Sequence, residues 1–316
     1  MIVTFTANPS VDRTLEISQL VRGAVMRASR TRVDGGGKGV NVTRALAANG
    51  YPSIAVLPNG GAEGVQLMGL LEAERLLVHP VPIAGAIRAN VTIVEPDGAT
   101  TKINEPGPTL SDAEVAQLTD ALLQAACGAD WAVLSGSLPP GAPADWYATL
   151  TAALHEQGVR VAVDADGAVL TASFAAGPDL VKPNQRELAQ ASGMPVDGRA
   201  DALAAVDRMR AAGARTVLAS LGAEGALLIE DGGTYHGSAK VAAPRSTVGA
   251  GDAMLAGFLA AGGAGIEALA EAVAWGTAAV SLPGSRMPGP TDLDRNAAKT
   301  TQMNTLEVAR EHAHHA

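Results

Sequence analysis

Residues 246–258 read Ser-Thr-Val-Gly-Ala-Gly-Asp-Ala-Met-Leu-Ala-Gly-Phe and join a glycine-rich turn to an apolar helix. Gly249 and Gly251 lack a Cβ, so the backbone here can adopt positive φ and point successive N–H groups, that of Ala250 included, at a ligand. The dipole of the following helix adds to this positive potential. The stretch therefore predicts an anion-binding turn with one carboxylate, Asp252, at the start of the helix.

A carboxylate beside an anion-binding turn requires a functional explanation, because two negative charges repel each other. Phosphoryl transfer to a hydroxyl supplies one: N–H groups stabilise the moving phosphoryl group while a carboxylate takes the hydroxyl proton. The pattern thus favours Asp252 as a general base and the N–H groups of residues 249–251 as phosphoryl ligands. The alternative is an ordinary helix start, with a first-turn acid and glycines in a tight turn.

The segment Thr-Val-Gly-Ala-Gly-Asp at 247–252 resembles the C-terminal signature of the ribokinase-like (PfkB) sugar kinases, whose GAGD aspartate is the catalytic base. A second segment, Gly-Gly-Gly-Lys-Gly-Val-Asn-Val at 35–42, resembles the N-terminal glycine motif of the same family. The resemblance extends from Asn8 to about Pro290. It implies a ribokinase-like α/β/α sandwich over residues 1–316, with a small β-sheet lid from segments at about 13–34 and 87–104.

Composition is consistent with a folded α/β protein. The chain has 316 residues, of which 47% are hydrophobic, enough for a sizeable core. Its net charge of −9 argues against nucleic acid or an anionic membrane as a partner. The N-terminus does not read as a signal peptide and no apolar run approaches a membrane span, so we expect a cytoplasmic protein. The single cysteine, Cys127, is expected to pack in the core.

Strand and helix patterns alternate along the chain, which predicts a mostly parallel sheet covered on both faces. A capping box at Ser111 predicts a helix to about Ala126. The remaining expected elements are strands at 2–6, 89–95, 100–103, 131–134, 159–164, 179–182, 215–220 and near 238–243, and helices at 38–50, 144–157, 200–212 and 266–280.

Several residues are candidates for the sugar site. Asp12 follows the first strand, where open α/β sheets bind ligands, and can accept hydrogen bonds from hydroxyls. Arg88 can clamp a phosphate in bidentate fashion. Lys38 opposes the dipole of its own helix, which favours a bound anion over an ordinary exposed lysine. The resemblance implies a substrate site built from Asp12, Gly36, Gly37, Lys38, Asn41, Arg88 and Ser137, with Lys38 and Arg88 holding a phosphate that the sugar already carries. A loop serine without a role is the alternative for Ser137.

The nucleotide side is predicted from residues 182–188, Lys-Pro-Asn-Gln-Arg-Glu-Leu. Asn184 and Glu187 are three residues apart on one helix face, so both can reach one hydrated cation. The resemblance implies that Glu187 and Asn184 serve Mg²⁺, with Lys182 and Asn184 near the phosphates of ATP. A capped surface helix is the alternative.

Ser220 and Gly222 are expected beside the nucleotide, Gly222 because it lets the backbone approach ATP. The chain has no Walker A motif, so its ATP site is inferred from the resemblance. Ser285 or nearby backbone is expected either to complete the adenine pocket or to hold a monovalent cation such as K⁺. The histidines of residues 311–316 read as a frayed end that could bind metal adventitiously.

The substrate is narrowed by the resemblance alone. Lys38 stands where some 6-phosphofructokinases of the family have a glycine, and residues 88–93, 102–108 and 282–288 look most like the branch that converts fructose 1-phosphate to fructose 1,6-bisphosphate. Tagatose-6-phosphate kinase and 6-phosphofructokinase remain alternatives. The resemblance also implies a homodimer formed through the lid.

Two other functional classes fit less well. A nicotinamide oxidoreductase needs G-x-G-x-x-G after its first strand, where this chain has Asn-Pro-Ser at 8–10. A sugar-phosphate sensor without activity could dispense with the base, but Asp252 is present.

Overall fold

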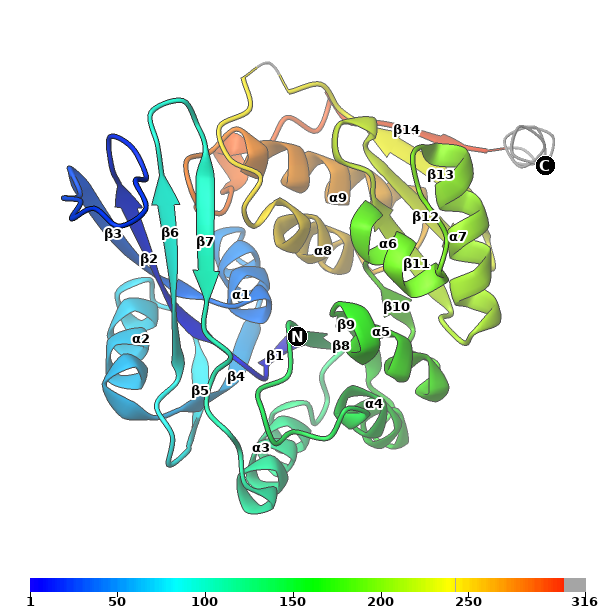
Figure 1. Cartoon of the computed structure of the whole chain (residues 1–316). Coiled ribbons are helices and arrows are strands. Elements are labelled where there is room, and N and C mark those ends of the chain that lie inside the picture. Colours follow the sequence, from blue (N-terminus) through cyan, green and yellow to red (C-terminus); the bar gives the residue numbers. More distant parts are fainter. Residues whose placement is uncertain (242, 304–316) are drawn as a thin grey trace.

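A computed structural model describes residues 1–241 and 243–303, which form a large central sheet between two layers of helices and a second, smaller sheet to one side (Figure 1). In spatial order the large sheet contains β14 (Lys299–Gln302), β13 (Gly233–Ser238), β12 (Ala226–Glu230), β11 (Thr216–Ser220), β10 (Leu180–Val181), β9 (Arg160–Asp164), β8 (Trp131–Ser135), β1 (Ile2–Thr6), β4 (Ser53–Asn59) and β5 (Val78–Pro82). Pairing is parallel from β11 to β5 and antiparallel from β11 to β14. The expectation of a mostly parallel sheet is confirmed.

The two helix layers follow from side-chain alternation along the strands. Phe5 and Leu134 face one apolar core, whereas Ile2 and Val133 face the other, as the two-residue repeat of a strand requires. The helices are α1 (Lys38–Ala48), α2 (Gly61–Ala73), α3 (Asp112–Ala125), α4 (Trp146–Glu156), α5 (Gly167–Ser173), α6 (Gln185–Ser192), α7 (Arg199–Ala211), α8 (Ala250–Ala260) and α9 (Gly265–Val280). Side chains of α3 to α7 contribute to the first core and those of α1, α8 and α9 to the second. The predicted three-layer sandwich is confirmed.

The small sheet has the order β3 (Arg30–Gly36), β2 (Ser10–Glu16), β6 (Arg88–Val94) and β7 (Thr100–Asn104). β2 pairs antiparallel with β3 and parallel with β6, and β6 pairs antiparallel with β7 across the turn at residues 95–99. Strand β2 begins at Ser10 and strand β3 ends at Gly36, so these two strands extend slightly beyond the lid segment expected at about 13–34. Figure 1 shows it beside α1 and α2.

Parallel pairing places the carboxyl ends of neighbouring strands at one edge of the large sheet. β1, β8, β9 and β10 are adjacent in that order, and each is followed by a segment with polar side chains. Ligands in open α/β sheets bind at such an edge. The residues after these strands therefore converge, although they are far apart in the sequence.

Some sequence expectations are wrong. The strand expected near 238–243 is β13 at Gly233–Ser238 instead, because the turn at 231–232 leads at once into antiparallel pairing with β12. Cys127 is exposed, not buried in the core, since it lies beyond the end of α3 in a turn that Gly128 continues at φ +73°. The capping box at Ser111 is confirmed. The histidines of residues 311–316 lie outside the described residues.

Within the part of the chain that the structure describes, no helix is both long and apolar enough to cross a membrane.

Gly257 should be required for the packing of α8 against α9. An added Cβ would lie 2.7 Å from Cγ of Trp275 and 2.9 Å from the carbonyl oxygen of Glu271. Gly257→Ala is therefore expected to lower the free energy of unfolding by about 1–3 kcal/mol through overpacking. Gly69→Ala, in an exposed position of α2 with no atom within 4 Å of the added Cβ, should raise it by about 0.5–1 kcal/mol. Urea denaturation measures both, and equal effects would contradict this account.

Candidate active site

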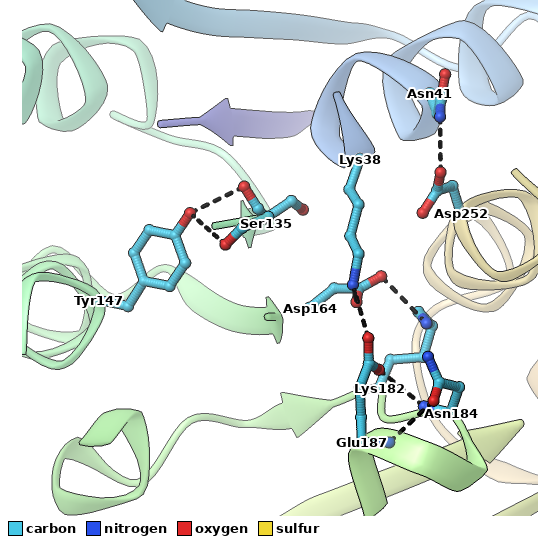
Figure 2. Close-up of polar contacts among 10 residues, drawn as sticks. Lys38, Asn41, Ser135, Tyr147, Asp164, Lys182, Asn184, Glu187 and Asp252 are labelled. Carbon is cyan, nitrogen blue, oxygen red and sulfur yellow. Dashed lines mark hydrogen bonds and ion pairs between the residues drawn. The ribbon is translucent and has the colours of Figure 1, made fainter. Parts of the chain in front are cut away.

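Asp252 lies in the first turn of α8 and only 7% of its surface is exposed. The side chain of Asn41, in the first turn of α1, donates from Nδ2 to Oδ2 of Asp252 at 2.8 Å. Figure 2 shows the two side chains facing each other across the gap between the helices. The predicted base and one predicted sugar ligand are thus in direct contact.

The start of α8 has the features of an anion site. Gly249 adopts φ +77° as the N-cap and gives the helix no side-chain cap. The N–H of Ala250 makes only a long hydrogen bond, 3.4 Å, to the carbonyl oxygen of Thr247, so the first turn retains N–H groups that can bind another acceptor. An added Cβ at Gly249 would lie 2.5 Å from Cε of Met287, and one at Gly251 would lie 3.1 Å from Nζ of Lys182. The positive φ of Gly249 requires glycine there, and Gly251 brings the helix close to a lysine.

Asp164, at the end of β9, is a fully buried carboxylate between two lysines. Nζ of Lys38 is 2.8 Å from its Oδ1, and Nζ of Lys182 is 3.1 Å from its Oδ2. Lys38 also contacts Oε1 of Glu187 at 3.1 Å. Figure 2 shows this chain of charges running from α1 to α6 beneath Asp252. Sequence reasoning missed Asp164, although its position after a buried strand was a usable signal.

These charges shift the pKa values of the site. Burial, together with the nearby Asp164 carboxylate, raises the pKa of Asp252 to about 6, against the opposing effects of Lys182, the Asn41 hydrogen bond and Lys38. Burial alone would raise the pKa of Asp164, but Lys182 and Lys38 outweigh it and lower that pKa. Burial alone would lower the pKa of Lys38, yet Asp164 and Glu187 raise it. Near neutral pH Lys38 is therefore an ammonium group and Asp252 is ionised.

Asn184 and Glu187 form a capping box at the start of α6. Oδ1 of Asn184 accepts from the backbone N–H of Glu187, and Oε2 of Glu187 accepts from that of Asn184, each at 2.9 Å. The capped helix weighed as an alternative is therefore present. Oε1 of Glu187 faces Lys38 and the site.

The groups around Glu187 fit a Mg²⁺ ion that keeps several of its water ligands. Among the described residues no three His, Cys, Asp or Glu side chains are grouped as a metal site. Mg²⁺ commonly keeps several waters and binds through one or two carboxylates and the phosphates of its substrate. Glu187 supplies a carboxylate oxygen of the right chemistry, so the residues fit a hydrated ion that arrives with a nucleotide.

A second group of polar side chains surrounds Asp12 in β2. Its Oδ1 accepts from Oγ of Ser10 at 2.7 Å and from Nδ2 of Asn90 at 2.9 Å. An added Cβ at Gly36 would lie 2.3 Å from Oδ2 of Asp12, and Gly37, at φ +127°, would place one 2.6 Å from Thr6. The glycine motif thus lets β3 pass close to Asp12 and the start of α1 pass close to Thr6 at the end of β1.

Arg88 belongs to this second group. Its Nε donates to the carbonyl oxygen of Asn8 at 3.1 Å and an Nη donates to that of Glu105 at 3.3 Å. Burial lowers the pKa of Arg88, while Asp12 acts in the opposite direction. Nδ2 of Asn8 also reaches Oγ of Ser137 at 3.5 Å. Lys38 and Arg88, predicted to share one phosphate, lie in different hydrogen-bond networks.

The two remaining nucleotide candidates flank the start of α6. Ser220 pairs with Asn184 in an isolated β-bridge, and its N–H donates to the carbonyl oxygen of Pro183. Gly222 adopts φ +59° and an added Cβ there would meet nothing within 4 Å. Space beside Gly222 is consistent with a ligand approaching the backbone. The structure contains no nucleotide, so the roles of both residues remain predictions.

A buried acid at the start of a helix without a side-chain cap, hydrogen-bonded to Asn41 and close to Lys38 and Lys182, is the arrangement that a phosphotransferase acting on a hydroxyl requires. The model of the pfkB family of carbohydrate kinases matches residues 6–292. The chain belongs to this family, and it is a kinase.

Relatives extend the match over nearly the whole length. A 1-phosphofructokinase of Rhodobacter capsulatus is 38% identical over 315 residues, covering 96% of this chain and 98% of the relative. The ATP-dependent 6-phosphofructokinase isozyme 2 of Escherichia coli is 34% identical, with 93% and 97% covered. A crystal structure of phosphofructokinase-2 from Escherichia coli in complex with potassium has a TM-score of 0.86 at 33% identity, covering 92% of this chain and 96% of that one.

The pKa of Asp252 should determine how kcat depends on pH. A base must be ionised to accept a proton, so kcat should fall as pH drops below about 6. A phosphate monoester also titrates near pH 6, and Lys182→Met separates the two causes. Removing a cation that lowers the pKa of Asp252 should move the acidic limb to higher pH. A limb that does not move would belong to the substrate.

Proposed function

We propose that this chain transfers the γ-phosphoryl group of ATP to the C6 hydroxyl of fructose 1-phosphate, giving fructose 1,6-bisphosphate. The observation that carries the proposal is Asp252, buried at the start of α8 among Lys38, Lys182 and Asn41. Relatives named 1-phosphofructokinase support this choice of sugar phosphate.

In this mechanism Asp252 accepts the proton of the attacking hydroxyl. The hydroxyl oxygen forms a bond to the γ-phosphorus, the bond from that phosphorus to the bridging oxygen breaks, and ADP leaves with the bond's electron pair. The N–H groups of Gly249, Ala250 and Gly251 hold the oxygens of the transferring group. The raised pKa of Asp252 suits the task, because a base near neutral pKa accepts a proton readily yet stays ionised.

The nucleotide is held from the α6 side. Lys182 and Asn184 lie near its phosphates, with Ser220 and Gly222 beside it. Mg²⁺, held through water near Glu187 and Asn184, supplies neutralisation of phosphate charge when it is bound. A monovalent cation such as K⁺ near Ser285 is part of the same proposal, which the potassium complex of the Escherichia coli relative supports.

The sugar is held from the small sheet. Asp12, Asn41 and Ser137 bind its hydroxyls, Gly36 and Gly37 allow close approach, and Arg88 binds the phosphate at C1. Lys38 was expected to help Arg88. Its ion pairs with Asp164 and Glu187 favour another position for its charge, facing the phosphoryl group in transit.

The small sheet also supports a homodimer. Large apolar side chains are exposed on β7 and on the segment between β2 and β3, namely Leu20, Val21, Val25, Met26 and Ile103, with Val25 at 88%. Exposed apolar side chains gathered in one segment, as Leu20, Val21, Val25 and Met26 are, are typical of an interface. A second copy of this chain is the proposed partner.

Two related substrates are the alternatives. The 6-phosphofructokinase of Escherichia coli resembles this chain nearly as closely as the 1-phosphofructokinases do. Tagatose 6-phosphate would also place a phosphate at the opposite end of the hexose. Either sugar leaves the role of Asp252 unchanged and moves the phosphate contacts.

The substrate is tested by measuring ADP formation with MgATP and fructose 1-phosphate, fructose 6-phosphate, tagatose 6-phosphate or fructose. We expect the highest kcat/KM with fructose 1-phosphate. Asp252→Asn should lower kcat by about a hundredfold or more, as loss of a general base does, which also excludes a contaminating kinase. Preference for a 6-phosphate would overturn the substrate, and an undiminished Asp252→Asn rate would overturn the mechanism.

Arg88 and Lys38 should differ in kinetic effect. Arg88→Ala removes a charge-assisted contact made before and during transfer, so KM for fructose 1-phosphate should rise about tenfold to a hundredfold. Lys38→Met should instead lower kcat about tenfold or more with little change in that KM. Unphosphorylated fructose is the control, because its weak turnover should be insensitive to Arg88→Ala. A raised KM in Lys38→Met would return Lys38 to the sugar phosphate.

A further inference from the structure

Arg44, on α1, connects three elements around the candidate base. One Nη donates to Oδ1 of Asn41 at 2.6 Å, and the other donates to the carbonyl oxygen of Gly35, in β3, at 3.0 Å. The guanidinium also forms an ion pair with both carboxylate oxygens of Glu74, just beyond the end of α2. The Arg44 side chain is only 12% exposed, and its contacts with Asn41 and Gly35 are partly buried, whereas Glu74 lies at the surface.

The contact with Arg44 determines which end of the Asn41 amide faces the active site. Oδ1 is an acceptor and Nδ2 a donor. Because a cationic donor occupies Oδ1, Nδ2 must point the other way, where it donates to Asp252 at 2.8 Å. A flipped amide would place Oδ1 against the carboxylate and Nδ2 against the guanidinium, and both contacts would be repulsive.

We propose that Arg44 is a positioning residue, which locks the amide of Asn41 so that an N–H donor always faces Asp252. This inference rests on the proposed role of Asp252 as the base. Arg44 acts through Asn41, whereas the charged groups that face Asp252 itself are Lys38, Lys182 and Asp164.

Loss of this lock has a specific consequence. An amide free to flip presents Oδ1 to Asp252, and that oxygen can pair only with the protonated carboxyl. The donor that favours the ionised form is lost at the same time. Both effects favour the protonated acid, so the acidic limb of kcat should move to higher pH.

The test compares Arg44→Met with Arg295→Met. Arg295 makes a similar two-contact ion pair with Glu271 on α9 and is the matched control for loss of an arginine–glutamate pair. Arg44→Met should raise the apparent pKa of the acidic limb by about half a unit to one unit, which lowers kcat about threefold to tenfold at pH 5.5 and less than twofold at pH 8. Arg295→Met should leave the limb unchanged.

Asn41→Ala shows whether Arg44 acts through the amide. In that background Arg44→Met should shift the limb no further, since no amide remains to be oriented. A shift that persists there would overturn the proposal. Should Arg44→Met fail to fold, Arg44→Lys keeps a cationic donor for Oδ1 of Asn41 and should leave the limb near its wild-type position, and a shift in this variant of about half a unit or more would overturn the proposal.

The outcome separates the two levels of inference. A wild-type protein without sugar-phosphate kinase activity, or with no effect of Asp252→Asn, removes the proposed function. If the wild type is active and Asp252→Asn lowers its kcat, but the acidic limb of Arg44→Met matches that of the wild type, only the proposed role of Arg44 is removed.

Discussion

The site depends on the burial of Asp164 between Lys38 and Lys182. A carboxylate without solvent is costly unless opposite charges and hydrogen bonds compensate it, and here two ammonium groups do so from different elements. The arrangement ties the end of β9 to the start of α1 and to the segment after β10. It also fixes the positive charge that an acidic protein must concentrate in order to bind phosphates, and it sets the field in which Asp252 titrates.

Glycine makes this concentration of charge sterically possible. Gly251 leaves room for Lys182 against the first turn of α8, and Gly36 leaves room for the carboxylate of Asp12 against β3. Both glycines lie where a backbone must pass a functional side chain at close range. The two glycine motifs therefore lie in two parts of the candidate site, one beside the residues proposed to bind the nucleotide and one beside those proposed to bind the sugar.

Much of the fold and part of the site could be predicted from the sequence, because regular patterns and contiguous motifs carry local information. The sandwich followed from alternating elements, and Asp252 from its place in a glycine turn. Asp164 was missed because one acid at a strand end has no neighbouring pattern, and its partners lie far away in the chain. The ion pairs that Lys38 makes could not be predicted from the sequence either, since ion pairing depends on the tertiary arrangement. Cys127 was misplaced because α3 ends at Ala125, so this residue lies in the turn that follows and not against the core.

The connection between β3 and α1 determines whether a movement of the small sheet reaches the helix. Only Gly37 separates the last residue of a small-sheet strand from the first residue of a helix that carries Lys38 and Asn41. A tilt of the small sheet must either be absorbed at that glycine or be passed to the helix. In the second case, any displacement of the small sheet also moves Lys38 and Asn41 relative to Asp252, which lies on the separate helix α8.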